Sequence, residues 1–145
     1  MKITIEDLKD GEEEEIIIRS NHLDDALLQM IYGIKMHDNK VAGLLNGRIC
    51  MIKPDNIYYF ESVDNKTFIY CDKQVYESKM KLYEIENEFE NTDFFRASKS
   101  VILNIAKIDY VSPAFNGRFE AALKNKEKVI ISRQYVPVLK KKLGL

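Results

Sequence analysis

Residues 94–104 read Phe-Phe-Arg-Ala-Ser-Lys-Ser-Val-Ile-Leu-Asn. Two aromatic residues begin this stretch and a strand-like apolar run ends it, so its two cations lie among residues that favour β structure. Residues 129–133 read Val-Ile-Ile-Ser-Arg and again place a cation at the end of an apolar strand, just before a predicted last helix. A charge that served only solubility would be unusual in such runs. We therefore interpret Arg96, Lys99 and Arg133 as candidate functional residues.

The chain has 145 residues, of which 46% are hydrophobic and 31% are charged, as is typical of an ordinary globular protein. This length predicts one domain, or one domain with a modest extension. The apolar runs are too short to insert into a membrane, and no apolar core of a secretion signal follows Met1. Cys50 and Cys71 lie in strand-like segments without a metal-binding pattern. We therefore expect buried free thiols and a cytoplasmic location.

The formal net charge of −1 hides a strong asymmetry along the chain. Residues 1–52 and residues 53–92 each carry a net charge of −4, whereas residues 93–145 contain 11 basic and 4 acidic residues and carry +7. A basic segment of this size is the electrostatic footprint of a nucleic-acid-binding surface. Lysines near the C-terminus, such as Lys140 and Lys141, are explained equally well as solvated charges.

The sequence predicts an α/β extension over residues 1–52, built as strand, strand, helix and hairpin. Residues 2–6 and 15–19 have the composition of strands, and residues 23–34 repeat apolar side chains at helical spacing. Asn46 and Gly47 predict a two-residue hairpin turn. The polar residues 53–56, which include a proline, are the best candidate boundary, although they are too short for a flexible linker.

Residues 53–145 predict an α+β domain that is mainly antiparallel. Short strand-like runs alternate with polar turns from residue 57 to residue 132, and apolar spacing around Leu82 and Ile85 indicates one short helix between them. A last helix begins at or after Arg133, because Pro137 is tolerated only near a helix start. Gly144 is suited to end that helix.

No pattern in the sequence indicates catalysis. His22 and His37 are isolated from other metal-ligating residues. Residues 43–48 lack the lysine and hydroxyl residue that end a phosphate-binding loop. The glutamates between residues 84 and 90 are best explained as the solvated face of a helix. We expect neither an enzyme nor a bound metal or cofactor.

A nucleic-acid interface explains the embedded cations with specific chemistry. Arginine presents a planar fork that can bond guanine O6 and N7 together, while lysine donates to guanine edges in the major groove. Ser98 and Ser100 place small hydroxyls on each side of Lys99, and hydroxyls of this kind bind phosphates. The polar residues 64–67 form a predicted hairpin tip that could supply a third contact. The alternative is that Lys99 and Arg133 only pair with acids on neighbouring strands.

Several pieces of the sequence occur in an order that is characteristic of one family: Pro54, residues 57–61, the helix around Leu82, residues 94–96 and 98–100, Asn104, Ile108 and residues 132–133. In this order they resemble the LytTR family of bacterial DNA-binding domains, over roughly residues 53–145. The resemblance implies an unusual arrangement of small β-sheets with short helices. It also implies transcription regulation by loops, rather than a recognition helix, that enter successive major grooves of double-stranded DNA.

Carried over by position, the resemblance assigns two groups of residues. The base-reading candidates are Lys99, Arg133, Lys66 and Thr67. The candidates for binding the DNA backbone or shaping the loops are Arg96, Ser98, Ser100 and Asn104. The charge of the last segment, rather than the resemblance, adds Lys140 and Lys141 as candidates for binding the DNA backbone. Many family members have a histidine at the position of Ser98, so contacts made by that imidazole do not carry over.

The resemblance also implies partners. Residues 1–52 are too short for the receiver domain that often precedes this domain, so the chain is similar to stand-alone members. We expect it to act as a homodimer on repeated half-sites. Similar members work beside small membrane proteins, which makes such a protein a possible partner. The extension would serve dimerisation or cover one end of the sheets. From another class, the alternative is a non-catalytic protein-interaction or small-ligand regulatory module with a basic face.

Overall fold

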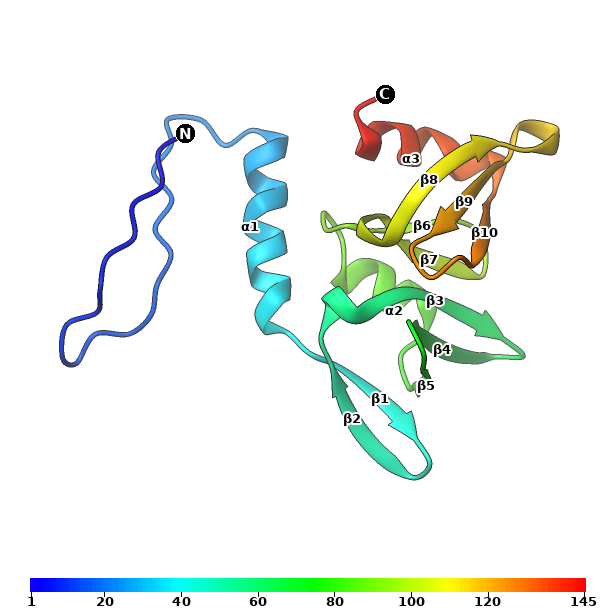
Figure 1. Ribbon diagram of the computed structural model, residues 1–145, viewed down its shortest axis with the longest axis horizontal. Coiled ribbons are helices and arrows are strands. Elements are labelled where there is room, and N and C mark those ends of the chain that lie inside the picture. Colours follow the sequence, from blue (N-terminus) through cyan, green and yellow to red (C-terminus); the bar gives the residue numbers. More distant parts are fainter.

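Two antiparallel sheets form the body of the protein in a computed structural model (Figure 1). The model describes the backbone of residues 1–145 and all side chains except those of Tyr32 and residues 35–38, which include His37. The larger sheet has the order β2-β1-β5-β4-β3-β7-β6 and the smaller one the order β10-β9-β8. The strands are β1 (Val41–Leu45), β2 (Arg48–Ile52), β3 (Ile57–Val63), β4 (Lys66–Cys71), β5 (Val75–Ser78), β6 (Phe94–Arg96), β7 (Val101–Asn104), β8 (Ile108–Pro113), β9 (Phe119–Leu123) and β10 (Lys128–Ile131).

Residues 94–104 decide the fold because their side chains divide between two hydrophobic cores. Phe94 and Ile102 belong to a core that lies between the larger sheet and the helix α2 (Leu82–Glu88). Phe95 and Leu103 belong to a second core, which the larger sheet shares with the smaller sheet and the helix α3 (Val136–Leu143). Successive side chains of a strand point to opposite faces. The unbroken apolar run is therefore explained by a strand buried on both sides.

An aromatic cluster fixes α2 on the larger sheet. The rings of Phe60, Phe89 and Phe94 have centroids between 4.7 and 5.7 Å apart in tilted and edge-on arrangements, which aromatic pairs prefer. All three side chains are at least 93% buried. This packing confirms the prediction of a short helix around Leu82 and Ile85.

The hairpin of β1 and β2 belongs to the larger sheet. Asn46 and Gly47 turn it with φ angles of 50° and 77°, as the Asn-Gly pair predicts, and β1 pairs with β5. The sheet is therefore continuous across residues 53–56, and the boundary expected there does not coincide with a break in the structure. No helix among the described residues is long and apolar enough to cross a membrane.

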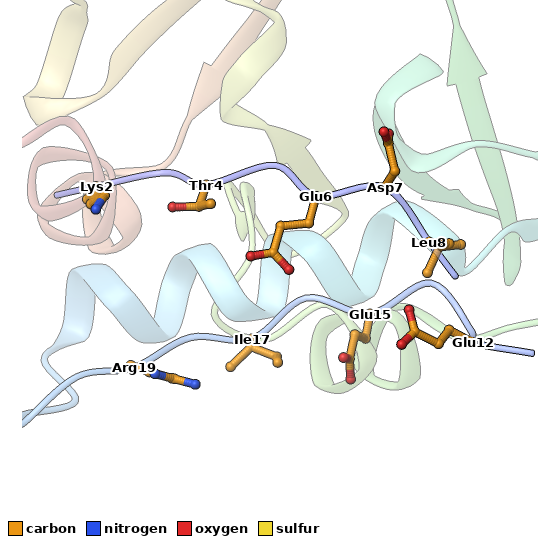
Figure 2. A pocket seen from close by; sticks show the side chains of 9 residues that line it. All are labelled: Lys2, Thr4, Glu6, Asp7, Leu8, Glu12, Glu15, Ile17 and Arg19. Atoms are coloured by element: carbon orange, nitrogen blue, oxygen red, sulfur yellow. The ribbon is translucent and has the colours of Figure 1, made fainter. Parts of the chain in front are cut away.

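The prediction of two strands at residues 2–6 and 15–19 is wrong. Both segments are extended and exposed, and the first hydrogen-bonded element is the turn in which the N–H of Glu12 donates to the oxygen of Lys9. An isolated two-stranded hairpin is at best marginally stable in water, and the four consecutive glutamates that follow Gly11 repel one another. Figure 2 shows the two segments side by side, with side chains such as Thr4 and Ile17 around an open hollow between them.

The helix α1 (Asp25–Asp38) confirms the helical periodicity predicted for residues 23–34. Asp24 caps it, because a side-chain oxygen of Asp24 accepts from the N–H of Leu27 at 2.8 Å. In Figure 1, α1 lies between the extended N-terminal residues and the two sheets. The N-terminal residues therefore lie at the opposite end of the molecule from the β3–β4 turn.

Candidate nucleic-acid interface

The turn at residues 97–100, between β6 and β7, is held in shape by the side chain of Arg96. The Nε of Arg96 donates to the backbone oxygen of Ser98 at 2.8 Å, and its Nη2 donates to the backbone oxygen of Lys99. Its Nη1 forms an ion pair with Glu86 of α2 at 3.2 Å. Arginine suits this position because its donors form a rigid planar fork. Arg96 therefore shapes the turn, while the side chain of Lys99 stays exposed.

Ser98 and Ser100 are partly buried on either side of Lys99. The Oγ of Ser98 accepts a hydrogen bond from the N–H of Ser100 at 3.3 Å, which closes the turn locally. The N–H of Ser62, at the end of β3, donates to the oxygen of Ser100 at 2.8 Å. The turn is thus attached to the neighbouring β3–β4 hairpin.

Arg133 is brought next to this turn by a hydrogen bond that links the two sheets. The N–H of Ser132, which follows β10, donates to the oxygen of Ala97 at 2.8 Å. Arg133 is the next residue, begins a short 3₁₀ turn before α3, and has an exposed side chain. Two cations that are 34 positions apart in the sequence therefore lie on neighbouring loops.

Lys99 and Arg133 do not pair with acidic side chains in the part of the molecule that the structure describes. Among the side chains that the structure describes, ion pairs join Arg96 to Glu86 and Lys128 to Glu120. No ion pair within that part of the molecule engages Lys99 or Arg133. Both remain available for a negatively charged ligand.

The tip of the β3–β4 hairpin supplies a third exposed cation, Lys66. Asp64 and Asn65 turn the hairpin with φ angles of 50° and 63°. Thr67 follows Lys66 but is only 3% exposed and pairs with Ser62. The expectation that Thr67 reads a base does not fit this burial, because alternate residues of a strand face opposite sides.

Asn104 has a structural role that the sequence described only in general terms. Its side chain is 3% exposed, its Nδ2 donates to the oxygen of Ile57 at 2.8 Å, and its Oδ1 accepts from the N–H of Ala106 at 3.0 Å. The amide is therefore occupied inside the fold, where it connects the end of β7 to the start of β3. Of its two expected roles, shaping the loops fits this burial and contact with a phosphate does not.

The lysines of α3 divide into exposed and occupied side chains. Lys140 and Lys141 are exposed, and the Nζ of Lys140 lies 5.5 Å from the centroid of the Phe119 ring. Lys142 donates to the backbone oxygen of Thr92 at 2.7 Å, and burial lowers the pKa of its ammonium. Lys142 therefore attaches α3 to the loop between α2 and β6, and the exposed side chains of Lys140 and Lys141 can meet phosphates.

One loop beside Arg133 was not recognised as part of the site from the sequence. The turn between β8 and β9 contains Asn116 and Gly117, which predict a hairpin, but nothing in the sequence places it near Arg133. An added Cβ at Gly117 would lie 2.8 Å from the Cδ of Arg133, so the backbone of the turn packs on the stem of that arginine. Phe115 and Arg118 of the same turn are exposed.

The three turns lie at one end of the molecule. Figure 1 shows the turns that follow β3, β6 and β8 at the right of the view, and the N-terminal residues at the left. Residues 47–144 match the family described as the LytTr DNA-binding domain. The chain belongs to the LytTR family. Residues 47–144 are therefore a DNA-binding domain of this family, as the resemblance predicts.

Known relatives agree with this assignment. The chain is 38% identical over 98 residues to the sensory transduction protein LytT of Enterococcus faecalis, and the match covers 68% of the chain and 40% of that relative. It is 30% identical over 101 residues to the transcriptional regulatory protein YpdB of Escherichia coli, which covers 68% of the chain and 41% of that relative. The chain thus spans about two-fifths of the length of these relatives.

A solved structure shows the same fold. The LytTr DNA-binding domain of a methyl-accepting/DNA response regulator from Bacillus cereus superimposes with a TM-score of 0.69 at 24% identity. The superposition covers 74% of this chain and 99% of that domain. The mainly antiparallel α+β arrangement predicted for the LytTR domain is therefore confirmed. The match to the family begins at Gly47, in the β1–β2 turn, and leaves β1, α1 and the extended N-terminal residues outside it.

Proposed function

We propose that this chain regulates transcription by reading specific sites in double-stranded DNA through adjacent loops. Lys99 and Arg133 are the base-reading residues, and Lys66 adds a contact from the β3–β4 tip. The observation that carries the proposal is the hydrogen bond from Ser132 to Ala97, because it holds the two main loops together. The two cations could not bind DNA if they were paired with acidic side chains of the protein. Both are exposed and make no ion pair among the described side chains.

The chemistry of the two cations differs. Arg133 can bond O6 and N7 of one guanine at once, which gives the strongest discrimination available in the major groove. Lys99 is a single flexible donor, placed by the backbone that Arg96 holds. The exposed Lys140 and Lys141 of α3 contact phosphates, which position the protein without reading sequence. The proposed role is binding, and it needs no catalytic step.

We further propose that the chain acts as a homodimer on two half-sites and that residues 1–34 form the dimer contact. Several large apolar side chains in this region are exposed: Ile3, Ile5, Leu8, Ile16, Ile17, Leu23 and Met30. A second copy fits this surface better than DNA does, because residues 1–24 carry 8 acidic and 3 basic residues. The same segment has the residue composition of strands, and its unpaired backbone N–H and C=O groups could form hydrogen bonds with a strand from a second copy.

The proposal is tested by selecting duplex DNA from a random pool and measuring affinity for the selected site at two salt concentrations. Arg133→Ala and Lys99→Ala should each cost about 1–3 kcal/mol on the selected site and relax preference at one base pair. Lys141→Ala should weaken binding to all sequences by a similar factor and reduce the salt dependence.

Lys73→Ala provides the matched control, because Lys73 is exposed at the other end of β4 from Lys66. It should leave affinity and selectivity unchanged. No enrichment of any duplex at low salt would instead favour a regulatory module whose basic face binds an acidic protein. Unchanged selectivity in Arg133→Ala would remove Arg133 from the base-reading set.

A further inference from the structure

The β8–β9 turn exposes a large apolar side chain on an ordered backbone. Phe115 is 82% exposed, more than Ile49 at 71% or Tyr83 at 65%. The turn around it is closed, since the N–H of Ala114 donates to the oxygen of Arg118 at 2.8 Å. A phenylalanine held out into water by a closed turn gains nothing for folding. Its ring is therefore available for contact with a partner.

The turn is built against the proposed base-reading arginine. Gly117 has a φ of 75°, and an added Cβ there would lie 2.8 Å from Cδ and 3.1 Å from Cγ of Arg133. The register of β9 and β10 explains this proximity, because Phe119 is paired with Ile131, two residues before Arg133. Phe115 and Arg133 therefore occupy neighbouring positions on the same end of the smaller sheet.

The surroundings of Phe115 favour an anionic partner, and its position beside Arg133 makes that partner the DNA of the proposed function. Residues 111–119 contain no acidic residue, and Arg118 and Asn116 are exposed on the same turn. In a DNA groove, phosphates lie next to the base edges. The exposed cation could therefore bind a phosphate while the exposed ring contacts a base. In the major groove, the apolar group that a phenylalanine can contact is the 5-methyl group of thymine.

We propose that Phe115 is a specificity-determining residue that contacts the methyl group of a thymine close to the base read by Arg133. This inference rests on the proposed function and adds a readout that cations and hydroxyls do not provide. It assigns the β8–β9 turn as a further DNA-contacting loop of this chain. The preference it creates is for thymine over cytosine, which lacks the methyl group.

The experiment uses the full chain and its selected duplex. Phe115→Ala should weaken binding to this duplex by about tenfold, while Tyr83→Ala, an exposed aromatic on α2, should leave it unchanged. Circular dichroism and thermal unfolding should show both variants folded like the wild type, because both side chains are exposed.

The decisive measurement replaces each thymine of the site by deoxyuridine, which removes only the methyl group. At one position the wild type should lose about fourfold in affinity, as expected for one buried methyl group, and Phe115→Ala should lose nothing further there. Equal losses for both proteins at every position, or full affinity in Phe115→Ala, would overturn the assignment.

Arg133→Ala separates this inference from the proposed function. If Arg133→Ala loses selectivity while Phe115→Ala binds like the wild type, only the role of Phe115 is wrong. If the wild type selects no duplex at all, the proposed function fails and the inference fails with it.

Discussion

At the scale of single residues, the site depends on two arginines that act in different ways. The guanidinium of Arg96 donates hydrogen bonds to backbone oxygens of its own turn and to Glu86. The side chain of Arg133 is exposed and packs against the backbone at Gly117. One arginine fixes a loop, whereas the other makes no ion pair among the described side chains and suits the base-reading role that we propose. The sequence pattern alone identified both as unusual, and the family resemblance placed Arg133 among the base-reading candidates and Arg96 among those that bind the DNA backbone or shape the loops.

Gly117→Ala should therefore impair Arg133 while leaving residue 133 itself unchanged. A Cβ at this position would overlap the stem of Arg133 and would sit on a backbone with φ of 75°. We expect a loss of about 1 kcal/mol or more in unfolding free energy and, separately, weaker selectivity at the base pair that Arg133→Ala affects. Chemical denaturation and competition binding measure the two effects.

Gly47→Ala is the matched control for that substitution. Gly47 has nearly the same φ, 77°, but no atom lies within 4 Å of an added Cβ. It should show a similar loss of stability and unchanged DNA selectivity. Equal selectivity in both variants would mean that the turn does not position Arg133.

At the scale of elements, the sequence predicted strands correctly where their side chains are buried in the two cores. It failed where contacts between elements distant in the sequence determine the burial of a residue or the position of a loop. The run at β7 is apolar throughout because both faces are buried, and this could be read from the sequence. Thr67 has the polar character of a hairpin tip, yet its position one residue inside β4 buries it. The proximity of the β8–β9 turn to Arg133 comes from strand register, which local sequence patterns do not encode.

The turn between β6 and β7 gives a prediction at this scale, because it is attached to α2 and to the smaller sheet. Arg96→Ala removes the donors that hold the oxygens of Ser98 and Lys99. We expect it to reduce selectivity for the DNA site about as much as Lys99→Ala does, because the turn that presents Lys99 loses its support. Competition binding with base-substituted duplexes measures this loss.

Glu86→Gln is the corresponding control, since it removes only the ion pair to Arg96. The Glu86 side chain is 48% exposed, and an exposed ion pair contributes little stability. Glu86→Gln should bind the site almost like the wild type. A loss of selectivity as large as in Arg96→Ala would show that α2, rather than the backbone contacts, orients the turn.

At the scale of the whole molecule, charge and position separate two surfaces. The basic turns lie at one end of the molecule and the acidic, extended N-terminal residues at the other, with α1 between them and the sheets (Figure 1). An acidic segment near DNA would be repelled by phosphates, so this arrangement favours a dimer contact that stays away from the duplex.

Deleting residues 1–24 tests the dimer directly. The shortened chain retains every strand of both sheets and should fold, because those residues are exposed and contribute to neither core. We expect sedimentation to show a dimer for the full chain and a monomer for the shortened one. On DNA with two half-sites the deletion should lower the affinity, because the second binding event is no longer linked to the first; on a single half-site it should leave the affinity of the subunit unchanged. A full chain that is monomeric at the concentrations used for binding would assign the exposed isoleucines to a different partner, and tighter binding of the shortened chain to one half-site would mean that the acidic segment masks the basic turns.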